Sequence, residues 1–354
     1  MRILALVGEA YGAGGGIAQY NRDAFDALSG DHQIRVLPRG GATAATTPAG
    51  VRQDKPIFDQ AAYAARALAV AFGWKPDAIF CGHLFMAPLA QMLSAVTGAR
   101  LIIQLHGIEA WPTPSPAIRR AVAAADLVLC VSRDTRARLL SWSALAPDLA
   151  LVLANTVGEA FTPGDRAAAR ARFGLADEKV ILSVGRLDKR EAYKGQDRVI
   201  DALPKLDALY LIAGDGDDRP RLEAQAARAG VTDRVRFLGR VAEADLPDLY
   251  RAADVFALPS TGEGFGIVYL EAMACGTPAI GLRAGGAPDA LGDGELGIVV
   301  EEAAFPAALN QLLSDRVDAG LSASVGVRFG PEVFRSRLRA ILSRLDFIPD
   351  RAAA

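Results

Sequence analysis

The sequence predicts an α/β protein of two doubly wound domains, and three observations support this prediction. Short apolar runs alternate with helix-periodic stretches along most of the chain, which is typical of βαβ units around a parallel sheet. The alternation breaks at ANTVGEAFTPGD, residues 154–165, where Asn, Gly and Pro indicate an interdomain linker, and then it restarts. A chain of 354 residues is also long for one core and comfortable for two.

Each domain is expected to hold six strands, in residues 1–155 and 156–330. Helix-periodic stretches such as Ile17–Leu28 and Asp59–Phe72 lie between the apolar runs. The expected strands of the two domains, in chain order, are Ile3–Val7, Ile34–Leu37, Ala78–Cys81, Leu101–Leu105, Leu127–Val131, Leu151–Leu153, Val180–Val184, Ala208–Ala213, Val235–Leu238, Val255–Leu258, Ala279–Gly281 and Ile298–Val300.

The composition predicts a soluble, cytoplasmic, globular protein. The chain is 51% hydrophobic and 23% charged. Cys81, Cys130 and Cys275 are widely spaced without a CxxC pair, which argues against disulfides and a structural zinc site. The N-terminus is too short in apolar residues for a signal peptide, and no apolar run approaches the ~20 residues of a membrane span.

The charge is unevenly distributed, with a net +3 in residues 1–153 and −5 in the remainder. Several arginines fall between Arg119 and Arg138, which fits attraction to an anionic lipid surface or a phosphorylated acceptor. Solvated helix faces explain the same residues equally well. The balance is too weak for nucleic acid, which requires a strongly basic domain.

The most informative segment is ALPSTGEGFGIVYLEAMACGTPAIG, residues 257–281. A strand ends at Leu258, a glycine-rich turn holds Glu263, and a helix-periodic stretch from Ile267 carries Glu271. Free amides and the dipole at such a helix N-terminus suit a phosphate. The two carboxylates, eight positions apart on one face, accept hydrogen bonds from hydroxyls. Amides for an anion and carboxylates for hydroxyls describe a sugar nucleotide, whereas the simpler alternative is a polar loop before an amphipathic helix.

A second motif, SVGRLDKREAYKGQD, residues 183–197, presents Arg186 and, after a short insertion, Lys194 in a loop after a strand. A departing nucleoside diphosphate needs a divalent metal or fixed cations, and Arg with Lys suits a pyrophosphate. Lys189 and Arg190 are interpreted as surface residues. Exposed loop cations remain the alternative for Arg186 and Lys194.

These two motifs resemble the donor site of the retaining glycosyltransferases of the family-4 type, whose GT-B fold has two Rossmann-like domains facing across a cleft. The resemblance is strong in residues 180–290 and moderate in the first half. It implies that Glu263 holds hydroxyls of the donor sugar, that Glu271 holds the ribose, and that two cations hold the diphosphate without a metal. It also implies a last helix, about Pro331–Leu345 within a segment reaching 354, that packs back on the first domain. The implied donor-binding residues are Gly15, Gly16, Arg186, Lys194, Val241, Glu263, Gly264, Phe265, Gly266 and Glu271, with Val241 in a base-reading loop, FLGRV, that acts largely through its backbone.

The glycine run after the first strand, GEAYGAGGGIAQYN, has two interpretations. It could be a dinucleotide fingerprint, but the GxGxxG spacing is imperfect and the second strand ends at Arg39 instead of an acid. The family's Gly-Gly loop fits better, with the amides of Gly15 and Gly16 approaching donor phosphate or acceptor.

A third glycine segment, AGDGDDRP, spells the metal-binding triplet of a different glycosyltransferase fold at Asp215–Asp217. Its place between a strand and a helix opened by Pro220 favours a turn and cap, and the family has a similar GDG turn. We expect no metal and no cofactor, with the nucleotide sugar as a co-substrate.

His106 follows the strand Leu101–Leu105, at the edge where α/β domains bind ligands. A lone histidine is often structural, but the resemblance implies a histidine here that hydrogen-bonds the transferring sugar. His106 and Glu263 are therefore the expected catalytic residues, and Glu109 is the expected acceptor-binding residue.

The predicted function is transfer of a sugar, from GDP-mannose or UDP-glucose, to a hydroxyl of a lipid-linked or saccharide acceptor. The resemblance points to envelope, exopolysaccharide or lipopolysaccharide synthesis, with peripheral contact at the inner membrane surface. A nucleotide-sugar epimerase of the same fold and a non-catalytic nucleotide-sugar sensor remain open alternatives.

Overall fold

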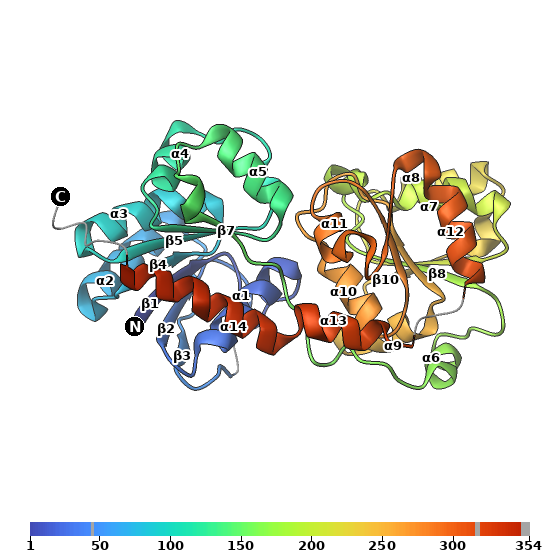
Figure 1. The fold of residues 1–354 in the computed structure, drawn as a ribbon, viewed down its shortest axis with the longest axis horizontal. Helices are drawn as coiled ribbons and strands as arrows, with labels where there is room; N and C mark the ends of the chain where they lie inside the picture. Colours follow the sequence, from blue (N-terminus) through green and yellow to red (C-terminus); the bar gives the residue numbers. More distant parts are fainter. Residues whose placement is uncertain (44–45, 316–318, 348–354) are drawn as a thin grey trace. The chain divides into compact units, whose positions relative to one another are not determined.

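The computed structural model describes residues 1–43, 46–315 and 319–347. The chain folds as two compact units (Figure 1). Unit 1 comprises Met1–Thr156 together with the segment that begins at Pro331, and unit 2 comprises Val157–Gly330. The division after Thr156 lies one residue beyond the boundary predicted from the sequence. Residues 348–354 of the predicted C-terminal segment lie outside the described residues.

Unit 1 is built on a parallel sheet that, in the described residues, has seven strands in the order β3-β2-β1-β4-β5-β6-β7. Its strands are short and almost wholly buried on both faces, as the near-continuous apolar runs predict. The strands are β1 (Arg2–Val7), β2 (Gln33–Pro38), β3 (Val51–Gln53), β4 (Ala78–Cys81), β5 (Arg100–Leu105), β6 (Leu127–Cys130) and β7 (Ala150–Val152).

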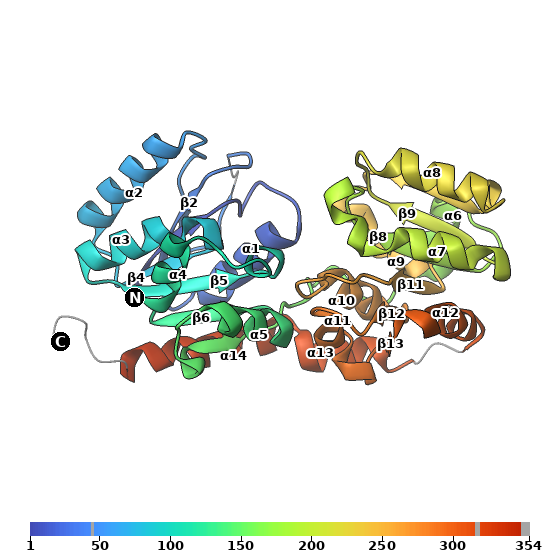
Figure 2. The same cartoon turned by 90° about the horizontal axis from the view of Figure 1, so that it is seen from above.

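Helices cover both faces of this sheet (Figure 2). One face packs against α2, α3, α4 and α5, and the other against α1 and α14. Their bounds are α1 (Gly16–Leu28), α2 (Gln60–Trp74), α3 (Ala87–Thr97), α4 (Pro116–Ala123), α5 (Arg133–Trp142) and α14 (Pro331–Leu342). The last of these, drawn red in Figure 1, runs along α1, where Phe334 meets the Tyr20 ring edge-on and Arg339 pairs with Asp31 at 2.7 Å.

Unit 2 repeats this architecture with a parallel sheet in the order β10-β9-β8-β11-β12-β13. The helices α7, α8 and α12 pack on one face, while α9 and α10 lie together on the other with α6 and α13. The elements are β8 (Val180–Val184), β9 (Leu209–Ala213), β10 (Val235–Gly239), β11 (Val255–Leu258), β12 (Ala279–Leu282), β13 (Ile298–Val300), α6 (Arg166–Arg172), α7 (Gln196–Ala202), α8 (Arg219–Arg228), α9 (Leu246–Ala252), α10 (Ile267–Ala274), α11 (Ala287–Ala290), α12 (Phe305–Ser314) and α13 (Leu321–Phe329).

Both sheets have one point where the strand order reverses. It lies between β1 and β4 in unit 1 and between β8 and β11 in unit 2. Loops that follow the two strands at such a point diverge to opposite faces and leave a crevice, which is the usual ligand site of a doubly wound sheet. The motifs singled out in the sequence follow one of these strands or its neighbour, except the base loop with Val241, which follows β10.

The predicted fold class is confirmed, and the errors are local. The sequence did not reveal β3, because VRQ at Val51–Gln53 has no apolar run and pairs only at the sheet edge with β2. The last helix ends at Leu342 instead of Leu345 and continues as a 3-10 turn. Within the described residues, no helix is both long and apolar enough to span a membrane.

Candidate functional site

The loop after β11, here called the donor loop (Pro259–Gly266), ends where α10 begins. Gly266 caps the helix with a φ of 92°, and a Cβ there would lie 2.6 Å from the Tyr269 ring, so no other residue fits. The first amides of a helix have no intrahelical partner, and the helix dipole adds partial positive charge at that end. The local structure is therefore the glycine turn and helix N-terminus that the sequence predicted, and its binding of an anion stays a prediction.

Gly285 and Gly286, which were not predicted from the sequence, pack against the backbone of the donor loop. The amide of Gly286 donates to the carbonyl of Glu263 at 2.7 Å, and a Cβ on Gly286 would lie 2.7 Å from the Cα of Phe265. The side chain of Phe265 is buried against Phe329, so this residue can offer only its backbone to a ligand. The adjacent glycines Gly285 and Gly286, in the loop after β12, were the available signal, since backbone packed against backbone excludes side chains.

The loop after β8, here called the clamp loop (Gly185–Gly195), carries both predicted cations. The Arg186 guanidinium pairs with the Glu191 carboxylate, and the Lys194 ammonium lies 3.1 Å from the other oxygen of the same carboxylate. The Arg186 side chain is 75% exposed, whereas those of Lys194 and Glu191 are 17% and 10% exposed. The clamp loop is thus a triad of two cations around one buried acid, and the acid was not predicted.

The clamp loop and the donor loop are joined directly. The amide of Thr261 donates to the carbonyl of Tyr193 at 2.9 Å. Gly195 has a φ of 82° and lies so close to the backbone of Pro259 that any Cβ would collide with it. Because β8 and β11 are neighbours in the sheet, residues about 70 positions apart form one continuous edge. This contact brings Lys194 and Glu263 into one site.

Glu263 has the most distinctive electrostatics of this site. Burial raises the pKa of its carboxyl above the usual 4.5, Lys194 opposes this shift, Glu191 adds to it, and the Ser260 hydroxyl lowers it. Its Oε1 atom is buried and accepts no hydrogen bond from the residues that the structure describes. A buried carboxylate oxygen without a donor suits a ligand that brings hydroxyl groups.

Glu271 lies about one turn into α10 and is partly buried. Its Oε2 accepts a hydrogen bond of 2.6 Å from the hydroxyl of Tyr250, a fully buried residue near the end of α9. Burial, followed by the nearby Glu271 charge, raises the pKa of Tyr250 well above its usual range, so the hydroxyl keeps its proton and donates. The Tyr250 hydroxyl therefore fixes the position of Oε2, and with it the orientation of the whole Glu271 carboxylate.

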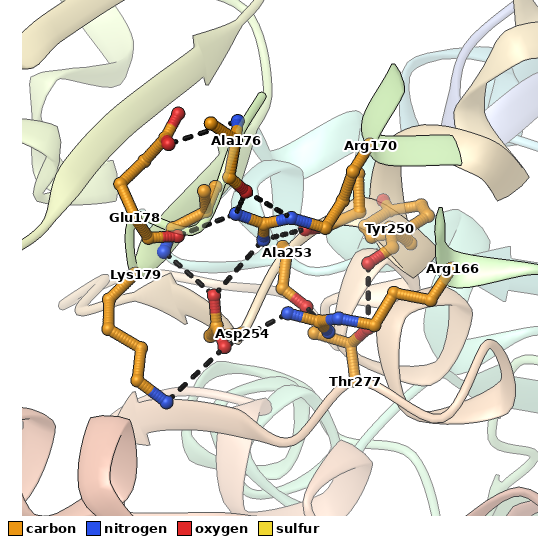
Figure 3. A network of polar contacts seen from close by, with 11 residues as sticks. Arg166, Arg170, Ala176, Glu178, Lys179, Tyr250, Ala253, Asp254 and Thr277 are labelled. Carbon is orange, nitrogen blue, oxygen red and sulfur yellow. Dashed lines mark hydrogen bonds and ion pairs between the residues drawn. The ribbon is translucent and has the colours of Figure 1, made fainter. Parts of the chain in front are cut away.

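The end of α9 that holds Tyr250 is anchored by a network around Asp254 (Figure 3). Arg166 and Arg170 reach its carboxylate at 2.9 and 3.4 Å, and the amide of Val180 donates to it at 2.8 Å. On the other side of Tyr250, the Thr277 hydroxyl donates to its carbonyl at 2.7 Å (Figure 3). These contacts fasten α6, α9 and the start of β8 together, which keeps Tyr250 under Glu271.

The Asp215–Asp217 turn supports the clamp loop. The amide of Leu187 donates to the carbonyl of Asp215 at 3.0 Å, and the Asp217 carboxylate accepts from the amide of Lys189 at 2.9 Å. Gly216 packs against the backbone of Leu187 so closely that a Cβ cannot fit. No three His, Cys, Asp or Glu side chains gather as a metal site in the part of the chain that the structure describes.

The predicted base loop follows β10 beside this turn. The amide of Gly214 donates to the carbonyl of Gly239 at 2.8 Å, and the half-buried Val241 follows two residues later. Val241 thus lies after the third strand from the donor loop, at the same edge of the sheet.

In unit 1, the glycine loop leads into α1 at the switch point. Gly15 caps the helix with a φ of 96°, and Gly16 is its first residue. Residues Gly14–Ile17 are exposed, and a Cβ on Gly14 or Gly15 would meet no atom within 4 Å. The amides of Gly15 and Gly16 therefore stand at an open helix N-terminus, as predicted for a loop that receives a ligand.

His106 lies at the neighbouring edge position, after β5. Its Nε2 is 2.9 Å from the carbonyl of Gly82, so Nε2 carries the proton and Nδ1 is the acceptor atom. The Tyr20 ring lies edge-on to the imidazole at 5.2 Å between centroids. Burial lowers the pKa of His106 to about 4, and the ring is neutral at neutral pH.

Glu109, the predicted acceptor residue, has a structural contact of its own. Its carboxylate accepts a hydrogen bond from the backbone amide of His106 and so closes the turn that carries the histidine. His83 lies 6.4 Å from His106 between ring centroids, and burial lowers its pKa also. The edge of unit 1 is therefore lined by neutral imidazoles.

Comparisons with known proteins agree with this arrangement. The family model described as Glycosyltransferase Family 4 matches residues 14–157, and the model Glycosyl transferases group 1 matches residues 165–324. A GDP-mannose-dependent alpha-(1-6)-phosphatidylinositol monomannoside mannosyltransferase of Mycolicibacterium smegmatis is 39% identical over 255 residues, 65% of each chain. A D-inositol 3-phosphate glycosyltransferase of Mycobacteroides abscessus is 39% identical over 197 residues, 53% of this chain and 44% of that protein. The chain thus spans less than two thirds of the length of these relatives.

Solved structures extend the likeness over the whole fold. Anabaena Alr3699/HepE, solved in complex with UDP and glucose, superposes with a TM-score of 0.81 at 24% identity and covers 97% of this chain and 100% of that one. A sucrose-phosphate synthase from Thermosynechococcus elongatus has a TM-score of 0.80 at 22% identity, with 100% of both chains covered. Two doubly wound units with a donor loop of this geometry define a protein of the GT-B class. The chain belongs to the glycosyltransferases of the family-4 type.

Proposed function

We propose that this protein transfers a sugar from a nucleotide-sugar donor to an acceptor hydroxyl, with retention at the anomeric carbon and without a metal. The observation that supports this most is the junction of the clamp loop and the donor loop. There, Arg186 and Lys194 offer positive charge beside Glu263, whose Oε1 accepts no hydrogen bond from any described residue. A diphosphate needs the cations and sugar hydroxyls need the carboxylate, and a hydrolase has no use for a cationic diphosphate clamp.

The proposed roles follow from the chemistry of each group. Arg186 and Lys194 stabilise the charge that develops on the leaving diphosphate, and the amides of Gly264–Gly266 assist at the N-terminus of α10. Glu263 accepts hydrogen bonds from the donor sugar and Glu271 from the ribose. In the same proposal, the backbone near Val241 contacts the base.

Unit 1 supplies the remaining proposed contacts. Because Nε2 of His106 is committed to Gly82, its Nδ1 atom accepts a hydrogen bond from a hydroxyl of the transferring sugar. A ring with a pKa of about 4 makes this contact as a neutral group at neutral pH. The amides of Gly15 and Gly16 bind donor phosphate or acceptor, and Glu109 contacts the acceptor besides holding its turn.

For the donor we propose GDP-mannose, since the first relative is named as GDP-mannose-dependent, and UDP-glucose is the competing candidate. The acceptor proposed is a lipid-linked or saccharide hydroxyl of envelope or polysaccharide synthesis. Relatives named for phosphatidylinositol monomannoside and for inositol 3-phosphate support an acceptor that carries a phosphate.

Acceptor-dependent release of nucleotide tests this function. The protein is first screened by thermal shift with GDP-mannose, UDP-glucose, GDP and UDP, since a ligand at a hundredfold its dissociation constant adds about 2.7 kcal/mol. The best donor is then incubated with and without candidate acceptors. Release that requires acceptor supports a transferase. Conversion of the sugar without acceptor indicates an epimerase, and binding without turnover under any acceptor indicates a sensor.

We also propose a cytoplasmic location with peripheral contact at the inner membrane surface. Three buried free cysteines suit a reducing compartment. Unit 1 exposes large apolar side chains at Phe58, Phe72 and Phe85, 72%, 58% and 48% exposed, and the Arg39 guanidinium lies 5.8 Å from the Phe85 ring centroid. Sedimentation with vesicles of anionic phospholipid tests this, and equal recovery with and without vesicles would refute it.

A further inference from the structure

The insertion between the two clamp cations, residues 187–193, is folded and turned inward. Asp188 caps a 3-10 helix, Lys189–Lys194, by accepting the amide of Arg190 at 2.9 Å, and Asp217 accepts the amide of Lys189 at the same distance. Within this helix Glu191 has a kinked backbone, with φ −108° and ψ 19°. These hydrogen bonds fix the first residues of the insertion, and the kinked backbone directs the Glu191 side chain toward the sheet edge.

Among the described residues, Glu191 forms ion pairs with Arg186 and Lys194 and not with the cations next to it in the sequence. Lys189 and Arg190 are its sequence neighbours, but both are exposed, and no ion pair between either of them and Glu191 is present in the described part of the chain. The carboxylate, 10% exposed, instead has one oxygen on Arg186 and the other 3.1 Å from Lys194. A buried carboxylate is costly unless it is paired, so burial itself selects these contacts.

The pairing leaves both cations able to bind a second anion. Arginine has five N–H donors in a planar fork and lysine has three, and Glu191 occupies only part of each set. Without Glu191, an arginine side chain 75% exposed would move among many rotamers, and two like charges would repel each other. The acid therefore sets the spacing and direction of two groups that a diphosphate must meet together.

We propose that Glu191 is the positioning residue of the diphosphate clamp, where its buried carboxylate holds Arg186 and Lys194 in the arrangement that binds the nucleoside diphosphate. This inference rests on the proposed function of the clamp. Glu191 itself touches no phosphate and acts through the two cations. Its charge also acts on Glu263, so one acid influences both loops of the donor site.

The test is nucleotide titration calorimetry on Glu191→Gln, Glu191→Asp and the wild type, with GDP and UDP as probes and guanosine and uridine as phosphate-free references. We expect Glu191→Gln to weaken binding of the better diphosphate about tenfold, with nucleoside affinity unchanged. Glu191→Asp, one methylene shorter, keeps the charge but cannot reach both cations, and we expect an intermediate loss. Glu223→Gln, which removes the exposed partner of Arg219, is the matched control and should change nothing.

Two further readouts separate positioning from a general structural role. In the Arg186→Ala/Lys194→Ala background, Glu191→Gln should cost no additional diphosphate affinity, because its two partners are gone. In the otherwise intact protein, loss of the Glu191 charge should move the acid limb of the transfer rate to lower pH, since repulsion from Glu191 raises the pKa of Glu263.

The outcomes distinguish this inference from the proposed function. If Arg186→Ala and Lys194→Ala leave diphosphate binding intact, the clamp itself is wrong. If they weaken binding while Glu191→Gln is neutral, or tightens it as expected of a competing anion, only the positioning role is overturned. An equal loss for nucleoside and diphosphate, or an equal loss in the double-alanine background, also overturns it. Should Glu191→Gln not fold, Glu191→Asp carries the same comparison.

Discussion

The two units of this protein share one topology and differ in what they place at its switch point. In unit 2 the loops after β8 and β11 bring Arg186, Glu191, Lys194 and Glu263 together in one charged site. In unit 1 the corresponding edge carries His106 and His83, both kept neutral by burial. The same backbone frame therefore offers a clamp of two cations and two acids in one unit, and neutral imidazoles beside a single carboxylate, Glu109, in the other. The difference shows that the strand order places a site, while the loop residues decide its chemistry.

The loops also differ in how tightly they are held. In unit 2, Gly195, Gly216 and Gly286 are glycine because backbone from another loop fills the space that a Cβ needs. In unit 1, Gly14 and Gly15 face open space and are exposed. The donor loop and clamp loop are thus preorganised by each other, whereas the glycine loop of unit 1 is held by the side chains of Asn21, Arg22 and Gln53 and leaves its two glycines open to solvent. A preorganised site suits the charged part of a reaction, since it needs no reorganisation when charge develops.

The largest expected effect comes from removing the charge of unit 2. Arg186→Ala combined with Lys194→Ala should abolish measurable transfer, since each loses charge-assisted contacts of about 1.5–3 kcal/mol, roughly 10²–10⁴-fold together. EDTA should leave the wild-type rate unchanged, as measured by acceptor-dependent nucleotide release. Loss of activity in EDTA that magnesium restores would instead assign the charge to a metal at Asp215 and Asp217.

The second test removes the neutral group of unit 1. His106→Ala should lower kcat by roughly 10²-fold while the affinity for the nucleoside diphosphate stays the same, because the histidine acts on the sugar and not on the phosphates. Calorimetry and steady-state transfer are measured on the same preparation, with His32→Ala as the control at an unrelated turn. A large loss of diphosphate affinity with turnover preserved would move His106 into the nucleotide site.

A third test uses the pH dependence of Glu263. Burial raises its pKa above 4.5, so the carboxyl is protonated at pH values where an ordinary glutamate is ionised. If the ionised form accepts sugar hydroxyls, the transfer rate should rise with pH through this raised pKa and then level off. Glu263→Gln should slow turnover about tenfold or more and abolish this rise of the rate with pH. Glu271→Gln should weaken donor binding but leave the rise with pH in place. A rise with pH that survives in Glu263→Gln contradicts the assignment.

The smallest expected effect concerns the support of Glu271. Tyr250→Phe removes the 2.6 Å hydrogen bond and should weaken donor binding several-fold with little change in kcat. Tyr210→Phe is the matched control, since this buried tyrosine of β9 in the same unit bonds Ser183 at 2.7 Å and, among the described residues, no carboxylate. Equal donor KM values in the two variants would show that Tyr250 is a packing residue only.

Much of this protein could be predicted from local sequence patterns. The apolar runs located nearly every strand within one or two residues, because burial on both faces of a parallel sheet leaves a continuous apolar signature. The exception, β3, is an edge strand of three residues without that signature. Glycine turns followed by helix-periodic stretches located both switch-point loops, because the need for φ above zero is a local property. Arg186, Lys194, Glu263 and Glu271 were singled out by residue type together with the family resemblance, and their roles stay predictions.

The tertiary structure alone decided which groups meet. Glu191 was one acid among basic neighbours in the sequence, and only the fold buries it between Arg186 and Lys194. The roles of Gly286 and Tyr250 could not be predicted for the same reason, since their partners Glu263 and Glu271 lie about 20 residues away across other elements. Periodicity and turn-forming residues are local properties that can be recognised in the sequence itself. The approach of Lys194 to Glu263 depends on the adjacency of β8 and β11, which the order of strands in the sheet determines and the order of residues does not state.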